Sequence, residues 1–559
     1  MSARHLILGL DGADPDLIEA FGRAKLPNLF RLIDRGVFAR LESVKPCATL
    51  PNWSTFLTAT DPGVHGVFDF TSRTGYSVAF TGGTVRTTPT ILSRLDAMGR
   101  LTACIGFPAT WPPERLKHGV FVSGWDSPVA FEGDSSFVWP TSLFDDMKAR
   151  FGGLRFDDVD EFDASREGWH EELPVALEAR IARKVELAEW LLESREWDVF
   201  AFYFGESDTA AHYLWSLHDA SSPRHPRCTS EESQRGLQRV YEALDRAVGV
   251  ILARAGGDSV EITLVSDHGS GGSSDKVLHI NRALADAGLL TFRKSESIFP
   301  ATRVTRAVKD AALTRLPPKV RELTFRLLSN ALPGWLESRA RFSSIDMEKT
   351  LVFSEELNYF PSIHLNLEGR EPLGRVSPSE RDAVIARTID ALVRLRDAWT
   401  DMPIVKHVHR REDLYRGAHV SRAPDLILEL HLDHGYSYNV MPSTSDSPTM
   451  RRIPESEWLG RKGRSLPGSH RSHGIYIAAG PTIRAGIATH PTMADASITT
   501  LHRMNVAATD EMSGRVLSEI LIDAGETTPL PLPIRNAAAA PNQDTAKIES
   551  RLRALGYID

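Results

Sequence analysis

Aspartate and histidine residues recur beside the strand-like segments of this sequence. The set comprises Asp11, Asp208, His212, Asp267, His268, His470 and His473. Each aspartate follows or ends an apolar run, apart from a short gap at Asp208, whereas the last two histidines precede one. Carboxylate oxygens and imidazole nitrogens suit zinc and other borderline divalent ions. Three aspartates and three histidines are too many ligands for one tetrahedral ion, but they fit two ions ~3.5–4 Å apart, which stabilise the attacking and leaving oxygens of a phosphoryl displacement.

The hydroxyl-rich segment 47–70, CATLPNWSTFLTATDPGVHGVFDF, supplies the candidate nucleophiles. Its cysteine, Cys47, lies two residues before Thr49, and His65 belongs to the same segment. A threonine hydroxyl is a weak nucleophile at neutral pH and needs a base or a metal ion beside it. The segment shows no such activator, so the activator must come from the distant aspartates and histidines.

Five apolar runs alternate with helical patterns along much of the chain. The runs are residues 5–10, 101–108, 197–205, 260–269 and 474–481. Long helical patterns at 176–194 and 236–256 precede two of them. This alternation predicts an α/β fold with a mostly parallel central sheet sandwiched by helices. Because ligands bind beyond the carboxyl ends of such strands, the run 474–481 must lie antiparallel for His470 or His473 to reach that edge.

The alternation stops after about residue 282 and resumes near residue 465. Residues 291–343 carry eleven Lys/Arg against four Asp/Glu and include a basic helical pattern at 302–328. Residues 360–371 alternate like a strand. We therefore predict four regions, namely core 1–281, an inserted cap 282–465, core 466–525, and a Pro/Ala-rich linker with a C-terminal helix at 526–559.

The composition is that of an ordinary globular protein, with 65 Lys+Arg, 73 Asp+Glu and a formal net charge of −8. That balance argues against a nucleic-acid polymer as a partner. The three cysteines form no CxxC pair, which is typical of a reducing compartment. No window holds the ~20 apolar residues of a membrane span. The sequence thus predicts a cytoplasmic protein with no membrane partner, and it leaves the oligomeric state open.

Seven segments together resemble the alkaline phosphatase superfamily. They are LILGLDGADPDLI, ATLPNWSTFLTATDPGVHGVFDF, GFPATWPPERLKHGVFVSG, YFGESDTAAHYLW, TLVSDHGSGG, HINRALADAGLL and GSHRSHGIYIAAGP. Within the superfamily, the chain is most similar to the type I phosphodiesterase/nucleotide pyrophosphatase family, and in particular to its bacterial and archaeal phosphohydrolases or phosphomutases. The resemblance covers residues 5–290 and 465–525 and implies an alkaline-phosphatase-like core.

The resemblance implies chemical roles for individual residues. The stretch TLPN matches the family's T-x-P-N, which implies that Thr49 is the nucleophile and that Asn52 contacts the transferring phosphoryl group. The implied ligand sets are Asp11, Thr49, Asp267 and His268 for one ion, and Asp208, His212 and His470 for the other. The spacing G-[ST]-H-R favours His470 over His473 as the last ligand.

Other residues near these motifs receive structural roles. Sulfatases of the superfamily use C/S-x-P-S-R, but Thr stands here in place of that Pro and the Arg is missing, so Cys47 is not expected to be the nucleophile. His65 matches a family histidine that is not a ligand, and we expect it to pack the loop. Four aromatic residues fit either a wall for the substrate's organic group or core packing, namely Trp53, Phe204, Tyr213 and Trp215.

We therefore expect a metal-dependent phosphohydrolase, a phosphodiesterase or nucleotide pyrophosphatase that acts on a small phosphate ester or nucleotide through a phosphothreonine intermediate. Two divalent ions are expected, zinc or alternatively manganese, with no organic cofactor. The first alternative is a phosphomonoesterase or phosphomutase for a small organic phosphate, with extra positive charge from Arg471, Arg303, Arg306 or Lys309. The second alternative is a catalytically silent binding protein, which the complete ligand set argues against.

Overall fold

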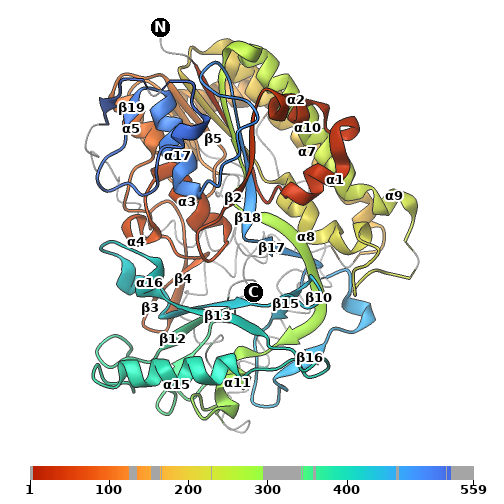
Figure 1. Ribbon diagram of the computed structural model, residues 1–559, viewed down its shortest axis with the longest axis vertical. Helices are drawn as coiled ribbons and strands as arrows, with labels where there is room; N and C mark the ends of the chain where they lie inside the picture. Colours follow the sequence, from red (N-terminus) through yellow and green to blue (C-terminus); the bar gives the residue numbers. More distant parts are fainter. Residues whose placement is uncertain are drawn as a thin grey trace.

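The structure is a computed structural model that describes residues 4–124, 135–152, 164, 166–227, 229–293, 342, 344–356, 361–460, 465–523 and 525–530. The described residues form a larger and a smaller lobe, which lie above and below the centre of Figure 1. The helix predicted at 302–328 and the C-terminal helix lie outside the described residues, as do Arg303, Arg306 and Lys309.

A central sheet of eight strands forms the middle of the larger lobe. In spatial order the strands are β2 (Gly36–Glu42), β18 (His473–Ala479), β9 (Glu261–Val265), β1 (His5–Leu10), β8 (Val199–Phe204), β5 (Thr102–Ile105), β6 (Val120–Val122) and β7 (Val138–Trp139). The neighbours from β9 to β6 are parallel, whereas β18 is antiparallel to β9 and β2, and β7 is antiparallel to β6. The predicted α/β class and the antiparallel direction of the run 474–481 are both confirmed.

Helices cover both faces of this sheet (Figure 1). Alternate side chains of a strand point to opposite faces, so Leu6 and Leu8 of β1 enter one buried cluster and Ile7 enters another. The first cluster includes residues of α1 (Pro15–Lys25), α2 (Pro27–Asp34), α6 (Thr141–Phe151), α7 (Trp169–Ser194), α8 (Glu206–His218) and α10 (Gly236–Ala255). The second includes residues of α3 (Thr49–Thr58), α5 (Ile91–Ala97) and α17 (Met493–Arg503). The predicted helix sandwich is therefore present.

The smaller lobe has a sheet and a hydrophobic core of its own. Its four antiparallel strands follow the order β11 (Val352–Phe353), β12 (Ser362–Leu365), β14 (Leu426–Leu430) and β13 (Val405–Arg410). The helices α11 (Ile280–Asp286) and α15 (Arg381–Val393) contribute to a third buried cluster with these strands. The strand that the pattern at 360–371 predicts is β12.

Strand β10 (Gly269–Leu278) connects the two lobes. It begins directly after His268 and pairs with β17 (Gly468–Arg471), β15 (Ser437–Val440) and β16 (Met450–Arg452). The hairpin of β3 (Thr71–Thr74) and β4 (Ser77–Phe80) also reaches the smaller lobe, because Arg73 forms an ion pair of 3.0 Å with Glu371. Residues of the predicted first core region thus take part in the smaller lobe.

The remaining elements of the described chain are short. They are α4 (Pro62–His65), α9 (Glu231–Gln234), α16 (Arg411–Leu414), β19 (Val506–Ala507) and β20 (Thr528–Pro529). In the part of the chain that the structure describes, no helix is both long and apolar enough to cross a membrane.

A buried ion pair joins two helices behind the carboxyl edge of the sheet. Lys184 Nζ of α7 lies 2.6 Å from Glu206 Oε1 of α8, and both side chains are almost completely buried. Replacing Lys184 by alanine leaves a buried carboxylate without its cation, so we expect the free energy of unfolding to fall by ~3–5 kcal/mol. Urea denaturation measures this change. The control is Arg515→Ala, which removes the exposed Arg515–Glu519 pair and is expected to cost less than ~1 kcal/mol; equal losses would contradict the prediction.

Candidate active site

The aspartates and histidines singled out in the sequence converge at the carboxyl edge of the central sheet. Asp11 directly follows β1, and Asp267 and His268 lie between β9 and β10. The other members of the group are Asp208 and His212 on α8, and His470 on β17. The turn after Asp11 requires Gly12, because its φ is +63° and a Cβ there would lie 3.0 Å from Asp208 atoms. This close approach brings the residues after β1 against the start of α8.

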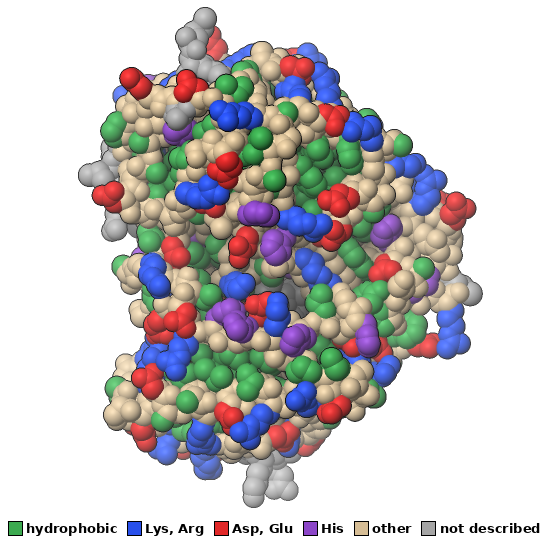
Figure 2. Space-filling model, viewed as in Figure 1, with side chains coloured by type: hydrophobic (Ala, Val, Ile, Leu, Met, Phe, Trp, Pro, Cys, Tyr) green, Lys and Arg blue, Asp and Glu red, His purple; other side chains and the backbone are tan. Residues whose placement is uncertain are grey.

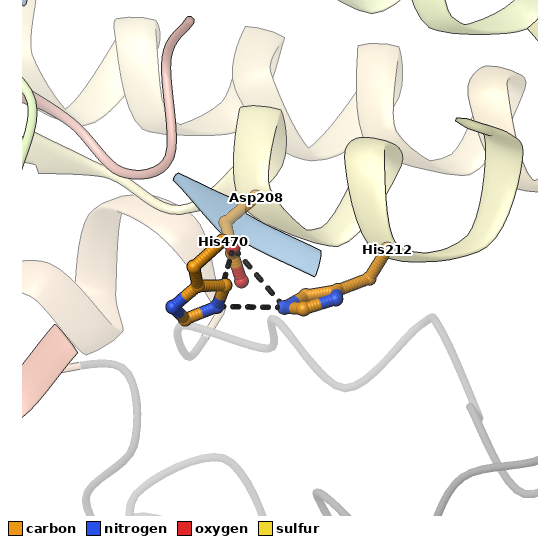
Figure 3. A group of neighbouring side chains, drawn as sticks. All are labelled: Asp208, His212 and His470. Carbon is orange, nitrogen blue, oxygen red and sulfur yellow. Dashed lines mark hydrogen bonds and ion pairs between the residues drawn. The ribbon is translucent and has the colours of Figure 1, made fainter. Parts of the chain in front are cut away.

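Asp208, His212 and His470 form one group that could hold a metal ion. The Nε2 atoms of His212 and His470 lie 3.3 Å and 3.5 Å from Asp208 Oδ1, and 3.0 Å from each other. Figure 3 shows the two rings and the carboxylate pointing toward a common centre. All three side chains are buried, so few water molecules can satisfy them.

His268 lies at the centre of a second group. Its Nε2 is 3.5 Å from Asp11 Oδ1 and 3.3 Å from Asp267 Oδ2. Thr49 Oγ1 lies 3.4 Å from the same nitrogen. Asp11, Asp208 and His268 together could also hold an ion, so Asp208 is within reach of both groups.

The three imidazoles are oriented by backbone carbonyl oxygens. The Nδ1 atoms of His212, His268 and His470 lie 3.2, 2.9 and 2.9 Å from the carbonyl oxygens of Gly468, Gly269 and Cys47, respectively. A carbonyl can only accept, so each Nδ1 carries the proton and each Nε2 presents a lone pair. Two such lone pairs only 3.0 Å apart, on His212 and His470, repel each other unless a cation or a proton lies between them. A hydrogen bond from Nδ1 to a backbone carbonyl, which leaves Nε2 for the ion, is typical of metal-binding histidines.

Three buried carboxylate oxygens of this candidate site have no hydrogen-bond partner. They are Asp11 Oδ1, Asp208 Oδ1 and Asp267 Oδ2. Asp11 Oδ2 accepts hydrogen bonds from Trp53 Nε1 (2.8 Å) and Tyr203 Oη (2.6 Å). These two bonds fix the direction in which Asp11 Oδ1 points. Unsatisfied buried carboxylate oxygens are costly. Together with the three Nε2 lone pairs, they fit the ligand set of divalent ions.

The charges of the site also favour bound cations. Burial raises the pKa of Asp11 to about 7, and the carboxylate of Asp208 adds to this rise. Burial, with Asp11 and Asp208 nearby, raises the pKa of Asp267 well above its usual value. Burial lowers the pKa of His268 to about 4 and that of His470 far below its usual value. Burial thus disfavours the carboxylates of Asp11 and Asp267 and the imidazolium forms of His268 and His470. Although burial opposes it, the contact between Asp208 and His212 lowers the pKa of Asp208 and raises that of His212. Bound cations would stabilise the buried carboxylates.

Thr49 occupies the first position of α3, and Asn52 fixes the segment that leads to it. The N-cap residue of α3 is Ala48, which provides no side-chain cap for the helix N–H groups. Asn52 Oδ1 accepts from Val44 N (2.7 Å), and Asn52 Nδ2 donates to Ala48 O (2.8 Å). The other contacts of Nδ2, to the carbonyls of Val44 and Pro46, are 3.4 Å long. The amide predicted to contact a phosphoryl group is thus buried and engaged with the loop 44–48.

Three other residues considered in the sequence lie apart from the metal-ligand cluster or are engaged elsewhere. The exposed His473 places its Nδ1 3.0 Å from Ser472 Oγ, so only His470 of the two late histidines joins the cluster. His65 is buried with its Nε2 3.0 Å from Thr55 Oγ1. Burial raises the pKa of the Cys47 thiol to about 12, which disfavours a thiolate there.

The site includes supporting residues that sequence reasoning missed. Tyr203 holds Asp11, Ser207 Oγ donates to Asp11 O (2.5 Å), and Ser43 Oγ donates to Asp267 O (2.7 Å). Tyr203 lies inside an apolar strand and therefore gave no signal of its own. Of the aromatic residues proposed as a substrate wall, three are buried and only Trp215 is partly exposed, the three being Trp53, Phe204 and Tyr213.

Arg471 does not point a free guanidinium at this site. Its Nη1 donates to Ser437 Oγ (2.7 Å) and His470 O (3.0 Å). Its Nη2 donates to the carbonyl oxygens of Gly272 (3.1 Å) and Gly435 (2.9 Å). Arg471, one of the residues offered as a source of positive charge for the phosphomonoesterase or phosphomutase, thus fastens β17 and β10 to the loop before β15.

The two late histidines provide a matched pair of variants. We expect His470→Ala to lower kcat by at least about a thousandfold, because it removes one of three candidate ligands and leaves only Asp208 and His212 in that group. His473→Ala removes an exposed imidazole three residues away, and we expect kcat within twofold of wild type. Steady-state kinetics with zinc present measure both. A larger loss in the His473 variant than in the His470 variant would contradict the arrangement of the site.

The fold and the site together define an alkaline-phosphatase-like α/β enzyme. A helix-covered, mostly parallel sheet gathers three aspartates, three histidines and a threonine at its carboxyl edge. The chain belongs to the type I phosphodiesterase/nucleotide pyrophosphatase family, whose sequence model matches residues 5–474. Members of this family hydrolyse phosphoric ester bonds, so the predicted family and enzyme class are confirmed.

The solved structure of a human protein shows the same fold at low sequence identity. Human ectonucleotide pyrophosphatase/phosphodiesterase 5 is 13% identical, with 93% of this chain and 100% of that chain covered and a TM-score of 0.51. Two structures of the murine protein, one of them an inactive variant in complex with AMP, are also 13% identical with the same coverage and a TM-score of 0.49. No curated protein matches the chain.

Proposed function

We propose that the protein is a metal-dependent phosphodiesterase or nucleotide pyrophosphatase that acts through a phosphothreonine. The observation that carries this proposal is the 3.4 Å contact between Thr49 Oγ1 and His268 Nε2, beside three carboxylate oxygens that have no hydrogen-bond partner. The proposed ligands are Asp11, Thr49, Asp267 and His268 for one ion, and Asp208, His212 and His470 for the other. Two bound divalent ions would supply the positive charge that favours the Thr49 alkoxide and offsets the charge developing on the phosphoryl oxygens.

In the proposed mechanism Thr49 Oγ1 attacks phosphorus in line with the leaving oxygen. The Oγ1–P bond forms as the bond to the leaving oxygen breaks, and water later hydrolyses the phosphothreonine to restore the hydroxyl. Thr49 stands at the N-terminus of α3, where backbone N–H groups lack intrahelical partners and the helix dipole favours an anion. The side chain of Trp53, one turn along the same helix, holds Asp11 in place by its hydrogen bond.

We propose that Asn52 serves this reaction in two ways. It holds the loop 44–48 in the conformation that precedes Thr49, through its hydrogen bonds to Val44 and Ala48. Its second N–H makes only contacts of 3.4 Å, so it is the donor available to an oxygen of the transferring phosphoryl group. A single donor of this type contributes about a hundredfold to a thousandfold to kcat.

Zinc is the ion we propose, with manganese as the alternative, because three of the seven proposed side-chain ligands are imidazoles. Small nucleotides and other phosphate esters are the proposed substrates, which fits a family of nucleotide pyrophosphatases. A cytoplasmic location stays a prediction; the free thiols of Cys47 and Cys104 are consistent with it, and cell fractionation tests it.

One comparison of substrates tests the proposed function against its alternatives. The protein is purified, loaded with zinc or manganese, and assayed with bis(p-nitrophenyl) phosphate and p-nitrophenyl phosphate. We expect faster turnover of the diester, because Arg471, a cation considered for a dianionic monoester, is engaged with Ser437 and Gly435. A strong preference for the monoester would favour the phosphomonoesterase or phosphomutase. Turnover of neither ester, together with no bound metal, would favour the silent binding protein.

A further inference from the structure

The segment just after α16 fastens the smaller lobe to the larger lobe. Figure 2 shows a hollow between the two lobes, and in the same view of Figure 1 α16 lies beside α4. Arg416 N donates to Asp61 Oδ1 (3.0 Å), and Asp61 is the N-cap residue of α4. His419 N donates to Gly63 O (2.7 Å) within α4. Two backbone donors of the smaller lobe thus hold this segment against the larger lobe.

Tyr415, the residue directly after α16, is buried at this contact between the lobes. Its ring packs edge-to-face against Phe68 of the larger lobe, with 5.1 Å between the ring centroids. Its hydroxyl donates to the carbonyl oxygen of Lys45 (2.7 Å). Burial raises the pKa of Tyr415 far above its usual value, so the hydroxyl keeps its proton and remains a donor. The ring therefore serves packing, whereas the hydroxyl reaches the loop that leads to Thr49.

The loop that contains Lys45 connects this hydrogen bond to the candidate metal site. Two residues after Lys45, Cys47 O accepts the hydrogen bond that orients the ring of His470 (2.9 Å). Pro46, between them, has a restricted φ, and its carbonyl oxygen accepts from Ala48 N (2.8 Å). This stretch is therefore stiff, so a displacement of the Lys45 carbonyl also moves the Cys47 carbonyl.

The same loop is held from two sides. Asn52 of the larger lobe binds the loop at Val44 N (2.7 Å) and at Ala48 O (2.8 Å). The carbonyl of Lys45 lies between these two points in the sequence and is held by Tyr415 of the smaller lobe. Hydrogen-bond partners that orient a ligand histidine affect metal affinity. Loss of the Tyr415 hydroxyl therefore frees the middle of a loop that orients such a histidine.

We propose that Tyr415 is a positioning residue of the metal site, because its hydroxyl holds the loop 44–48 so that Cys47 O keeps His470 directed at the bound ion. This inference rests on the proposed function and deepens it, since it assigns a role to a residue outside the proposed ligand set. Tyr415 acts through the loop rather than by contact with the substrate or the ion. The smaller lobe thereby contributes to the geometry of the metal site.

Hydrogen–deuterium exchange of the zinc-free protein tests the positioning without turnover. Tyr415→Phe keeps the ring and removes only the hydroxyl, so we expect the peptide that contains residues 43–52 to exchange at least about fivefold faster. Tyr438→Phe is the matched control, because it removes a buried hydroxyl that donates to Asp397 Oδ2 (2.8 Å). The control is expected to leave the exchange of residues 43–52 unchanged. Unchanged exchange in Tyr415→Phe would overturn the proposal.

Zinc affinity separates positioning from a contribution to stability alone. Each of the two variants loses one buried hydrogen bond, so we expect similar losses of thermal stability in the presence of a chelator. Only Tyr415→Phe is expected to raise the Kd for zinc, by about tenfold or more, because it loosens a partner that orients His470. Competition with a chelator measures these Kd values. A Tyr415→Phe variant that binds zinc as tightly as wild type would show that Tyr415 only packs.

A double-mutant cycle with His470→Ala tests whether the effect passes through that histidine. With His470 present, we expect Tyr415→Phe to lower kcat for bis(p-nitrophenyl) phosphate by about tenfold and to leave KM within about twofold. In His470→Ala, we expect the same change to lower kcat by less than about twofold, because the ring that it positions is gone. Equal losses in both backgrounds would overturn the effect through His470. If wild type hydrolyses no ester, the proposed function fails, and the exchange of residues 43–52 still decides whether Tyr415 positions the loop.

Discussion

Replacement of Thr49 by alanine is expected to lower kcat for bis(p-nitrophenyl) phosphate by about ten-thousandfold or more, a loss of at least about 5.5 kcal/mol of transition-state stabilisation. The methyl group that remains cannot form a bond to phosphorus, and only the surrounding charges continue to act. Steady-state kinetics at saturating zinc measure the loss. Acid quenching during turnover, followed by mass spectrometry of the peptide that contains residues 45–60, is expected to find a phosphothreonine in wild type and none in the variant.

Two neighbouring variants sharpen this result. Thr49→Ser keeps a hydroxyl at the start of α3 and is expected to recover at least about a hundredfold of the lost rate. Cys47→Ala leaves the carbonyl that orients His470 and is expected to change kcat by less than threefold. A phosphate group found on another residue, or a Thr49→Ala variant within tenfold of wild type, would contradict the assignment of the nucleophile.

The central sheet could be predicted because its strands are buried on both faces and are short and continuous in sequence. HLILGL is entirely buried, and the runs that became β8 and β9 are as apolar. The direction of β18 followed from a chemical requirement, since the late histidines reach the carboxyl edge only when that strand is antiparallel. The smaller lobe was less predictable. Its strands β12 and β14 pair although Ser362 and Ile427 are 65 residues apart, and the hairpin β3–β4 joins it from the larger lobe.

The candidate site could be predicted where the sequence places a ligand next to a strand or on one helix face. Asp208 and His212 are four residues apart on α8, and this spacing alone brings them to one side. The supporting contacts depend on packing instead. Tyr203 reaches Asp11 from a neighbouring strand 192 residues away, and no local pattern marks a strand tyrosine as a donor to a carboxylate. Asn52 was recognised from its motif. Its hydrogen bonds to Val44 and Ala48 depend on the conformation of the loop 44–48, which only the folded structure shows.

Replacement of Asp208 is the second change that we expect to have a large effect on activity, because Asp208 is within reach of both groups of candidate ligands. Asp208 Oδ1 lies within 3.5 Å of the Nε2 atoms of His212 and His470, and Asp208 also belongs to the group with Asp11 and His268. We expect Asp208→Ala to bind fewer than one zinc ion per chain, compared with two in wild type, and to lose kcat by at least about a thousandfold. Metal analysis of dialysed protein and steady-state kinetics measure the two effects. His268→Ala, which removes a ligand from one group, is expected to keep one ion.

Thermal stability gives an independent test of the same residue. Wild type is expected to gain about 2.7 kcal/mol of stability for each bound ion at zinc concentrations a hundredfold above Kd, because the ions bind only the folded chain. Asp208→Ala is expected to lose that gain. In the presence of a chelator, however, the variant is expected to lie within about 1–2 kcal/mol of wild type, because two effects oppose each other. It loses the contacts of Asp208 with His212 and His470, which lower the pKa of Asp208, and it also loses a buried charge that repels Asp11. The exposed Asp146→Ala is the control and should respond to zinc like wild type. A chelated Asp208→Ala protein that is several kcal/mol less stable than chelated wild type would mean that this carboxylate holds the fold rather than a metal ion.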